Sequence, residues 1–372
     1  MKKEYKKKII LGEPLIPYKS AINLYSKVIS DNFPNEGDYT KLFEKKISKL
    51  LKVRYVATCT SGTIAIFLAL KALGIRKQDE VLVPNITFPA TLNAISLSGA
   101  TPILVDVNKD NLLMSIDDIK KKINKRTKVV LPVHISGRAS NIEEIIKIAK
   151  RKKIFVVEDA AEAFMSSIKN KFLGTYGKIG CFSFAPNKII TTGQGGAIVT
   201  NDKFIYKTIS RLKDQGRVGP TTGGEDNYVS VGYNFKFTNL QATLGLSQLV
   251  SINQRVKILK NHYLFYKKNI KENNNFKLFN FNLKNGEVPL WTDAFCTKRN
   301  ELFKFLSSKN IFCRYFWQPI NTCSPYKKSF KGLENSKDLQ KKLIWLPSSL
   351  KMKKQDLIKV CKLINQFIKK KL

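Results

Sequence analysis

The chain has 372 residues, of which 43% are hydrophobic and 10% aromatic, and this composition is typical of a folded protein rather than a disordered one. Its 66 basic and 28 acidic residues give a net charge of +38. The excess is mostly lysine, without the aromatic-interleaved arginine stripes that bind nucleic acids, so we expect no nucleic-acid partner. The simplest interpretation is a lysine-rich solvated surface, although such charge also attracts phosphate-bearing substrates.

Cysteine spacing and hydropathy indicate the compartment. The six cysteines have no CxxC spacing, and His134 and His262 are the only histidines, so we expect no metal site and reduced thiols. The apolar stretch 9–11 is too short for a signal-peptide core, and no later run approaches the length of a membrane span. We therefore expect a soluble, cytoplasmic protein without a membrane span.

Short apolar runs alternate with amphipathic segments between about residues 55 and 200. The predicted strands cover residues 55–58, 80–83, 102–105, 128–131 and 154–157. The predicted helices cover residues 63–73, 89–97, 116–123 and 142–151. This alternation predicts βαβ crossovers and a largely parallel sheet covered by helices.

The pattern changes after Gly232. A long helix, either continuous or broken, is predicted over 240–270, and a strand-like run follows at 290–296. Two more helices are predicted over 299–306 and 355–370. We therefore expect two domains: a large domain over 1–250, in which residues 1–15 form an N-terminal arm, and a small α+β domain over 251–372.

The first segment with candidate chemistry is the small-residue turn at 58–63, between a strand and a helix. Such a turn leaves backbone N–H groups free at a helix N-terminus, where the helix dipole favours an anion. The hydroxyls of Ser61 and Thr63 can donate to the same anion. Ordinary helix capping by these residues is an equally good explanation.

The second segment is the apolar strand 154–157, which is followed by Glu158 and Asp159. Adjacent strand residues point to opposite faces, so only one of the two acids can face a given pocket. Ligands of open α/β sheets gather at the carboxyl ends of strands. The alternative is that Asp159 caps a following helix.

The third segment contains Lys188, between an apolar strand and the glycine-rich turn 193–196. Lysine is rarely buried without a partner, and lysines in apolar surroundings act as imine-forming nucleophiles. The alternative is an exposed lysine beside a hairpin turn. An anion site, a carboxylate and then a lysine 29 residues later (188 minus 159) are the groups that pyridoxal 5′-phosphate requires for its phosphate, its ring nitrogen and its aldehyde.

In their order and in their amino-acid sequences, these segments resemble those of the DegT/StrS-type sugar aminotransferases, which are fold-type I pyridoxal-phosphate enzymes. The resemblance runs from about residue 16 to the C-terminus. The segments that carry it are 60–63, 83–88, 131–134, 157–163, 187–196, 231–236 and 346–348. It implies an α/β fold with a mostly parallel seven-stranded sheet between helices and a smaller α+β C-terminal domain.

The resemblance also implies roles at the cofactor. Lys188 would hold pyridoxal phosphate as a Schiff base and shuttle protons, and Asp159 would pair with the pyridine nitrogen. Phe88 would stack on the ring, and Glu162 would lie near the phenolic oxygen, where much of the family has glutamine. The remaining cofactor-binding residues that it implies are Thr60, Ser61, Gly62, Thr63, Ser183 and Asn234. Because Asn234 would reach the neighbouring subunit's cofactor, the resemblance implies a homodimer with shared active sites.

The implied reaction is transamination of a nucleotide-linked 4-keto-6-deoxyhexose by L-glutamate for polysaccharide biosynthesis, because the motifs are most similar to perosamine-synthase-like 4-aminotransferases. Asn187, Lys236 and Arg314 are the candidate substrate residues. Lys236 replaces a common arginine, and Gln215 and Asn321 replace frequent histidines, so the identity of the sugar stays open. The alternatives are amination at C3, a sugar dehydratase, which typically lacks the lysine, and a basic regulatory protein on the same fold. His134 matches the family and is interpreted as structural.

Overall fold

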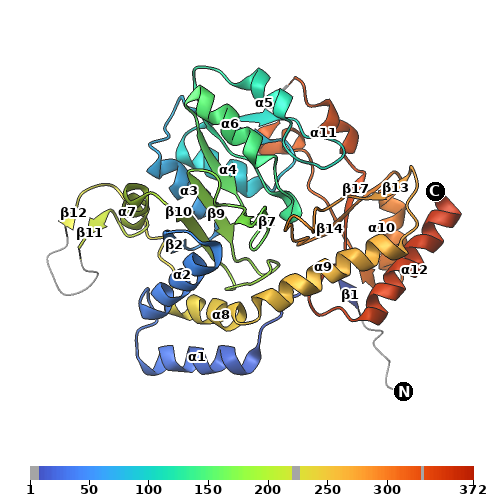
Figure 1. The fold of residues 1–372 in the computed structure, drawn as a ribbon, viewed down its shortest axis with the longest axis horizontal. Helices are drawn as coiled ribbons and strands as arrows, with labels where there is room; N and C mark the ends of the chain where they lie inside the picture. Colours follow the sequence, from blue (N-terminus) through green and yellow to red (C-terminus); the bar gives the residue numbers. More distant parts are fainter. Residues whose placement is uncertain (1–7, 220–226, 328–330) are drawn as a thin grey trace.

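The computed structural model describes residues 8–219, 227–327 and 331–372, and its centre is a seven-stranded sheet (Figure 1). The strand order is β2-β10-β9-β6-β5-β3-β4. In chain order the strands are β2 (Tyr55–Cys59), β3 (Glu80–Pro84), β4 (Thr101–Val105), β5 (Thr127–Val130), β6 (Phe155–Asp159), β9 (Ile179–Ser183) and β10 (Gly196–Thr200). β10 pairs antiparallel with both β2 and β9, and the other neighbours are parallel. The expected mostly parallel, seven-stranded sheet is confirmed.

Helices cover both faces of this sheet, and each face has its own hydrophobic cluster. Side chains of α3 (Gly62–Ala72), α4 (Pro89–Ser98) and α7 (Lys203–Leu212) belong to one cluster. Side chains of α2 (Asp38–Leu51), α5 (Ile116–Lys122), α6 (Ile142–Lys152) and α8 (Asn239–Leu249) belong to the other. Successive residues of β3 alternate between the two clusters, as expected for a strand whose two faces are both buried.

A second sheet forms in the C-terminal part, with the antiparallel order β13-β14-β17-β16. Its strands are β13 (Phe276–Leu278), β14 (Thr292–Cys296), β16 (Arg314–Tyr315) and β17 (Leu343–Leu346). A third hydrophobic cluster joins this sheet to α10 (Arg299–Ser307) and α12 (Lys354–Lys371). This arrangement supports our proposal of a small domain over 251–372.

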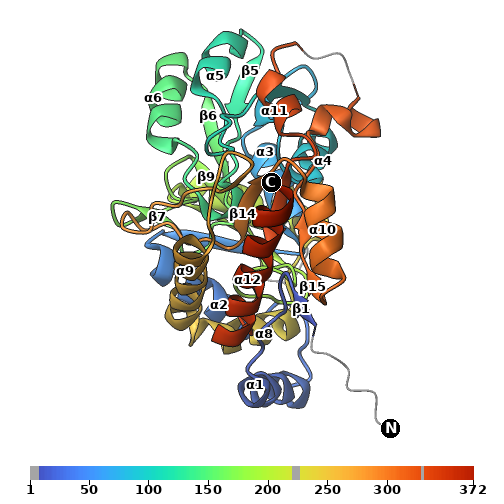
Figure 2. The ribbon, with the colours of Figure 1, turned by 90° about the vertical axis from the view of Figure 1, so that its right-hand side faces the viewer.

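The predicted long helix after residue 239 is two helices. α8 begins with a capping box formed by Thr238 and Gln241 and ends at Leu249, and α9 (Ile252–Asn269) follows after a short break. α9 extends from the large sheet toward α12, so it connects the two parts of the molecule (Figures 1 and 2). None of the helices in the described part of the chain is long and apolar enough to cross a membrane.

The N-terminal segment is packed into the C-terminal part. β1 (Ile9–Ile10) pairs in parallel with β15 (Ile311–Phe312). The Leu11 carbonyl accepts a hydrogen bond from the Ser348 N–H at 2.7 Å. A Cβ added at Gly12 would lie 3.0 Å from the ring of Trp291, so the backbone there lies directly against the indole. Residues 9–12 therefore form part of the wall around Trp291.

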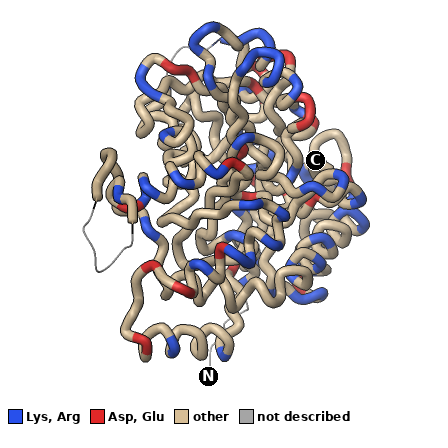
Figure 3. The backbone as a smooth tube through the Cα atoms, turned by 60° about the vertical axis from the view of Figure 1, so that its left-hand side comes forward, with Lys and Arg blue, Asp and Glu red and all other residues tan. Residues whose placement is uncertain are grey.

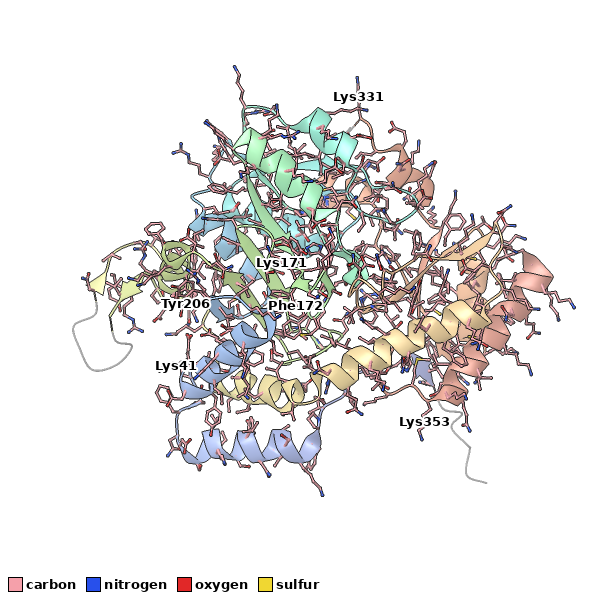
Figure 4. The ribbon with its side chains drawn as sticks, in the orientation of Figure 1. Lys41, Lys171, Phe172, Tyr206, Lys331 and Lys353 are labelled. Atoms are coloured by element: carbon pink, nitrogen blue, oxygen red, sulfur yellow. The ribbon has the colours of Figure 1, made fainter. Side chains whose placement is uncertain are left out.

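Basic residues are spread over the surface rather than gathered on one element (Figure 3). Lys41, Lys331 and Lys353, for example, are exposed at three separate edges of the molecule (Figure 4). All six cysteines are free thiols. This distribution fits a solvated lysine-rich surface.

A buried ion pair between Arg138 and Asp293 joins the large sheet region to β14. Their side chains are 2% and 0% exposed, with 2.5 Å between Nη2 and Oδ2. Burial raises the pKa of Asp293, and the charge of Arg138 opposes this rise. Because an unpaired buried carboxylate is costly, we expect Arg138→Met to lower the free energy of unfolding by about 3–5 kcal/mol, measured by urea denaturation.

The matched control is Lys169→Met, which removes the exposed lysine of the Lys169–Glu143 pair. We expect it to change the free energy of unfolding by less than about 1 kcal/mol. Equal effects of the two substitutions would contradict the importance assigned to the buried pair.

Candidate active site

One cavity of about 260 Å³ lies at the carboxyl ends of β2, β3, β6 and β9. Ten of the thirteen residues predicted from the sequence to form the site line it. They are Ser61, Gly62, Thr63, Phe88, Asp159, Glu162, Ser183, Asn187, Lys188 and Arg314. The carboxyl edge of the sheet thus brings together segments that lie far apart in the sequence.

A tight turn between β2 and α3 forms one end of the cavity. The Ser61 hydroxyl caps α3 by accepting the Ile64 N–H at 3.3 Å. A Cβ on Gly62 would lie 2.8 Å from the Cβ of Ser183, so only glycine fits where α3 begins against the end of β9. The N–H groups of Gly62 and Thr63 begin the helix and have no intrahelical partner, so they are available to an anion in the cavity.

Asp159 forms the wall at the end of β6. Its Oδ2 accepts the Thr91 hydroxyl at 2.7 Å, and its Oδ1 accepts the Ala161 N–H at 3.1 Å. Burial raises the pKa of Asp159, and these two hydrogen bonds and Lys188 oppose the rise. The chain continues from Asp159 in turns, so the alternative that Asp159 caps a helix is wrong.

Glu158 points away from the cavity and is fully buried. Its Oε2 lies 2.8 Å from Nε2 of His134. Because Nδ1 of His134 accepts the Ser140 N–H, Nε2 carries the ring proton and donates it to Glu158. Glu158 also accepts three backbone N–H groups at 2.6–2.8 Å, those of Gly174, Tyr176 and Gly177. Only Asp159 of the two acids faces the cavity, and His134 has a structural environment.

Lys188 lies between β9 and β10 with its Nζ 3.4 Å from Oε1 of Glu162. The two side chains are 13% and 5% exposed. Glu162 is held by two further donors, the indole N–H of Trp291 at 3.2 Å and the Ser136 N–H at 2.8 Å. Lys188 stands in an apolar stretch of the sequence, but the fold gives it a buried carboxylate partner.

Three predicted site residues lie outside the cavity lining, namely Thr60, Asn234 and Lys236. Asn234 is exposed and forms a backbone bridge with Asp214. Nζ of Lys236 lies 2.7 Å from Oδ1 of Asp214. Of the other departures from the family pattern, Asn321 pairs with the Asn85 side chain at 3.0 Å.

Sequence reasoning did not assign the other eleven residues that line the cavity, and five of them have large aromatic or buried hydroxyl side chains. They are Thr87, Thr91, Trp291, Trp317 and Trp345. The three tryptophans are all that the chain contains, and Arg314 lies over the Trp345 ring at 5.7 Å. Their rarity, and their place after residue 290, was the only available signal. They form an aromatic wall opposite the large sheet.

The residues present fit pyridoxal 5′-phosphate. The Gly62–Thr63 turn offers N–H donors to a phosphate, and Asp159 offers a carboxylate to a ring nitrogen. Lys188 offers an amine to an aldehyde, and Phe88 exposes its ring at the cavity edge. Each group that the cofactor needs therefore has a matching residue in one cavity.

Comparison with known proteins agrees with this chemistry. Residues 18–365 match the model of the DegT/DnrJ/EryC1/StrS aminotransferase family. The chain is 37% identical to GDP-perosamine synthase of Escherichia coli O157:H7, over 90% of this chain and 91% of that protein. It is 34% identical to GDP-perosamine synthase of Vibrio cholerae, over 79% of this chain and 80% of that protein.

Solved structures agree on the fold. The putative sugar aminotransferase Spr1654 from Streptococcus pneumoniae, in its PMP form, superposes with a TM-score of 0.93 at 22% identity, covering 98% of this chain and all of that one. Helicobacter pylori PseC superposes with a TM-score of 0.91 at 24% identity over the same fractions of the two chains. The chain belongs to the DegT/DnrJ/EryC1/StrS aminotransferase family, whose enzymes depend on pyridoxal 5′-phosphate.

Proposed function

We propose that the protein transfers the amino group of L-glutamate to C4 of a nucleotide-linked 4-keto-6-deoxyhexose, in the cytoplasm, for polysaccharide biosynthesis. The observation that carries the proposal is the meeting of Lys188, Asp159 and the Gly62–Thr63 turn in one cavity. The relatives support the sugar class: they include the GDP-perosamine synthases and, at 29% identity over 92% of this chain, the dTDP-4-amino-4,6-dideoxy-D-glucose transaminase of Shigella dysenteriae.

Residues from several segments of the chain are proposed to bind the cofactor. Pyridoxal phosphate, when bound, supplies an aldehyde for amine exchange and a ring that stabilises negative charge on carbon. The N–H groups of Gly62 and Thr63 would bind its phosphate, together with the hydroxyls of Ser61 and Ser183, which line the same cavity. Asp159 would accept a hydrogen bond from the protonated ring nitrogen and keep it charged, and Phe88 would pack against the ring. Thr60 extends the phosphate turn.

Proton transfer is assigned to Lys188. Its Nζ takes the proton from the α-carbon of glutamate and later delivers a proton to C4 of the sugar. Glu162, fixed by Trp291 and Ser136, holds Nζ at the cavity wall. Asn187 and Arg314 line the same cavity and are proposed to contact the substrate. The tryptophan wall excludes water, which strengthens these polar interactions.

We further propose a homodimer with shared active sites. α1 (Tyr18–Ser30) stands apart from the large sheet and packs along α8 (Figure 1). Its exposed apolar side chains are Tyr18, Ile22, Tyr25 and Ile29, with exposed fractions of 44–74%. A contiguous apolar face of this kind marks an interaction surface. Asn234 and Lys236, exposed or partly exposed outside the cavity of their own chain, would serve the cavity of the other subunit.

Two reactions test the function. With L-glutamate alone, the enzyme loaded with cofactor should release 2-oxoglutarate and lose the absorbance of the lysine-bound cofactor. The enzyme that has taken up the amino group should then aminate one member of a panel of GDP-, dTDP- and UDP-linked 4-keto and 3-keto sugars. Mass spectrometry identifies the amino sugar that is formed. Release of no 2-oxoglutarate would favour a dehydratase, and amination only of 3-keto sugars would place the reaction at C3. Failure to bind the cofactor would favour the alternative of a basic regulatory protein on the same fold.

A further inference from the structure

Two buried threonine hydroxyls form a chain that ends on Asp159. Thr87 and Thr91 are 0% and 1% exposed, and both line the cavity. The Thr91 hydroxyl lies 2.7 Å from Oδ2 of Asp159. The Thr87 hydroxyl lies 3.1 Å from that of Thr91. The three side chains therefore form one continuous hydrogen-bonded line.

The donor-to-acceptor direction of these hydrogen bonds follows from the number of protons that each group can donate. A hydroxyl has one proton to donate, whereas an ionised carboxylate only accepts. When Asp159 is ionised, Thr91 must donate to Oδ2, and the oxygen of Thr91 must accept the proton of Thr87. A protonated Oδ2 would instead donate to Thr91, and the proton of Thr91 would need a different acceptor. The line is therefore ordered in one direction by the charge of Asp159.

The carboxylate oxygens of Asp159 have one fixed donor each. Oδ2 has Thr91, and Oδ1 has the N–H of Ala161 at 3.1 Å. A carboxylate oxygen accepts about two hydrogen bonds, so each has room for one more on the cavity side. Burial raises the pKa of Asp159, and these two hydrogen bonds oppose that rise, so they favour the ionised form, which can accept a hydrogen bond from an N–H group of a ligand.

Thr91 is placed by a short, well-defined piece of structure. Pro89 begins α4, and Phe88 precedes it in extended conformation, so Thr91 lies in the first helical turn. The Thr91 N–H donates to the Phe88 carbonyl at 3.2 Å. The same turn thus supplies the exposed ring of Phe88 to the cavity and the hydroxyl of Thr91 to Asp159.

We infer that Thr91 is a positioning residue, which holds Asp159 ionised and directed at the ring nitrogen of the cofactor, and that Thr87 orients Thr91. This inference rests on the role proposed for Asp159. A hydrogen bond to a charged group has a net value that corresponds to a change of about 10- to 100-fold in an equilibrium constant.

The experiment compares two molecules that differ at one ring atom. Pyridoxal phosphate and its 1-deaza analogue, in which CH replaces the ring nitrogen, are titrated into protein stripped of cofactor, and both dissociation constants are measured. The unchanged protein should prefer pyridoxal phosphate, since only that molecule pairs with Asp159. Thr91→Val, which keeps the shape and removes the hydroxyl, should reduce the preference about 10- to 100-fold. Thr91→Ser should retain it, and Thr87→Val should cause a smaller loss.

Affinity for the deaza analogue controls for misfolding, because a disrupted cavity would bind both molecules less tightly. An unchanged ratio of the two affinities in Thr91→Val, whether both fall equally or neither falls, would overturn the inference. If Asp159→Asn removes the preference while Thr91→Val keeps it, the role of Asp159 stands and that of Thr91 fails. No preference in the unchanged protein would overturn both.

Discussion

Lys188→Ala should abolish transamination, with a loss of at least about 10²–10⁴-fold in turnover, because Lys188 is the lysine that lines the cavity among the described residues of its own chain. The variant should fold, since Glu162 keeps the donors Trp291 and Ser136. Reduction with borohydride followed by peptide mass spectrometry gives a second measurement. The cofactor should be attached to Lys188 in the unchanged protein and to no residue in the variant.

Lys169→Ala is the matched control, because Lys169 is an exposed lysine whose partner is Glu143 on the surface. It should leave turnover and covalent attachment unchanged. Attachment of the cofactor to a different lysine in the unchanged protein would contradict the site. Turnover retained in Lys188→Ala would contradict the assignment of the proton transfer.

Glu158→Gln should destabilise the protein by about 2–6 kcal/mol although it removes no atom that faces the cavity. Oε2 of Glu158 accepts from His134 and Gly174, and Oε1 accepts from Tyr176 and Gly177. An amide offers one oxygen, so its NH₂ would face two donors. Each donor left unsatisfied in the interior costs about 1–3 kcal/mol. Urea denaturation measures the loss.

The same change should weaken cofactor binding, because Glu158 fixes the end of β6 and Asp159 is the next residue. Glu143→Gln, on an exposed surface pair, should change the free energy of unfolding by less than about 1 kcal/mol. Similar stabilities of the two variants would show that the four donors to Glu158 find other acceptors.

The individual elements of the large sheet were predictable because apolar runs of strand length alternate with helical periods, as at 80–83 and 89–97, which are β3 and α4 in the structure. The strand order was not predictable from such local patterns, because it depends on pairings such as that of β2 with β10, 137 residues apart at Cys59 and Gly196. α1 was missed because Val28 is its only buried residue, so the helix has little core to signal it.

In the site, too, residues in local motifs were predictable, whereas contacts between distant segments were not. Lys188 and Asp159 were predictable because each stands at a strand end in a recognisable motif. Thr91 was not, because a threonine in the first turn of a helix has no local mark of a carboxylate 68 residues away. The Glu162 partner of Lys188 was also hidden, since 26 residues and the strand β9 separate them in the chain.

The pairing of β1 with β15 has a consequence for synthesis on the ribosome. Ile9 is made 302 residues before its partner Ile311 (311 minus 9), and Leu11 is made long before Ser348. The strands between residues 55 and 200 can associate while the chain is still being translated, since domains fold as units from the N-terminal side. Residues 9–12 must remain unpaired through this period, so the nascent enzyme acquires the wall around Trp291 only near the end of translation.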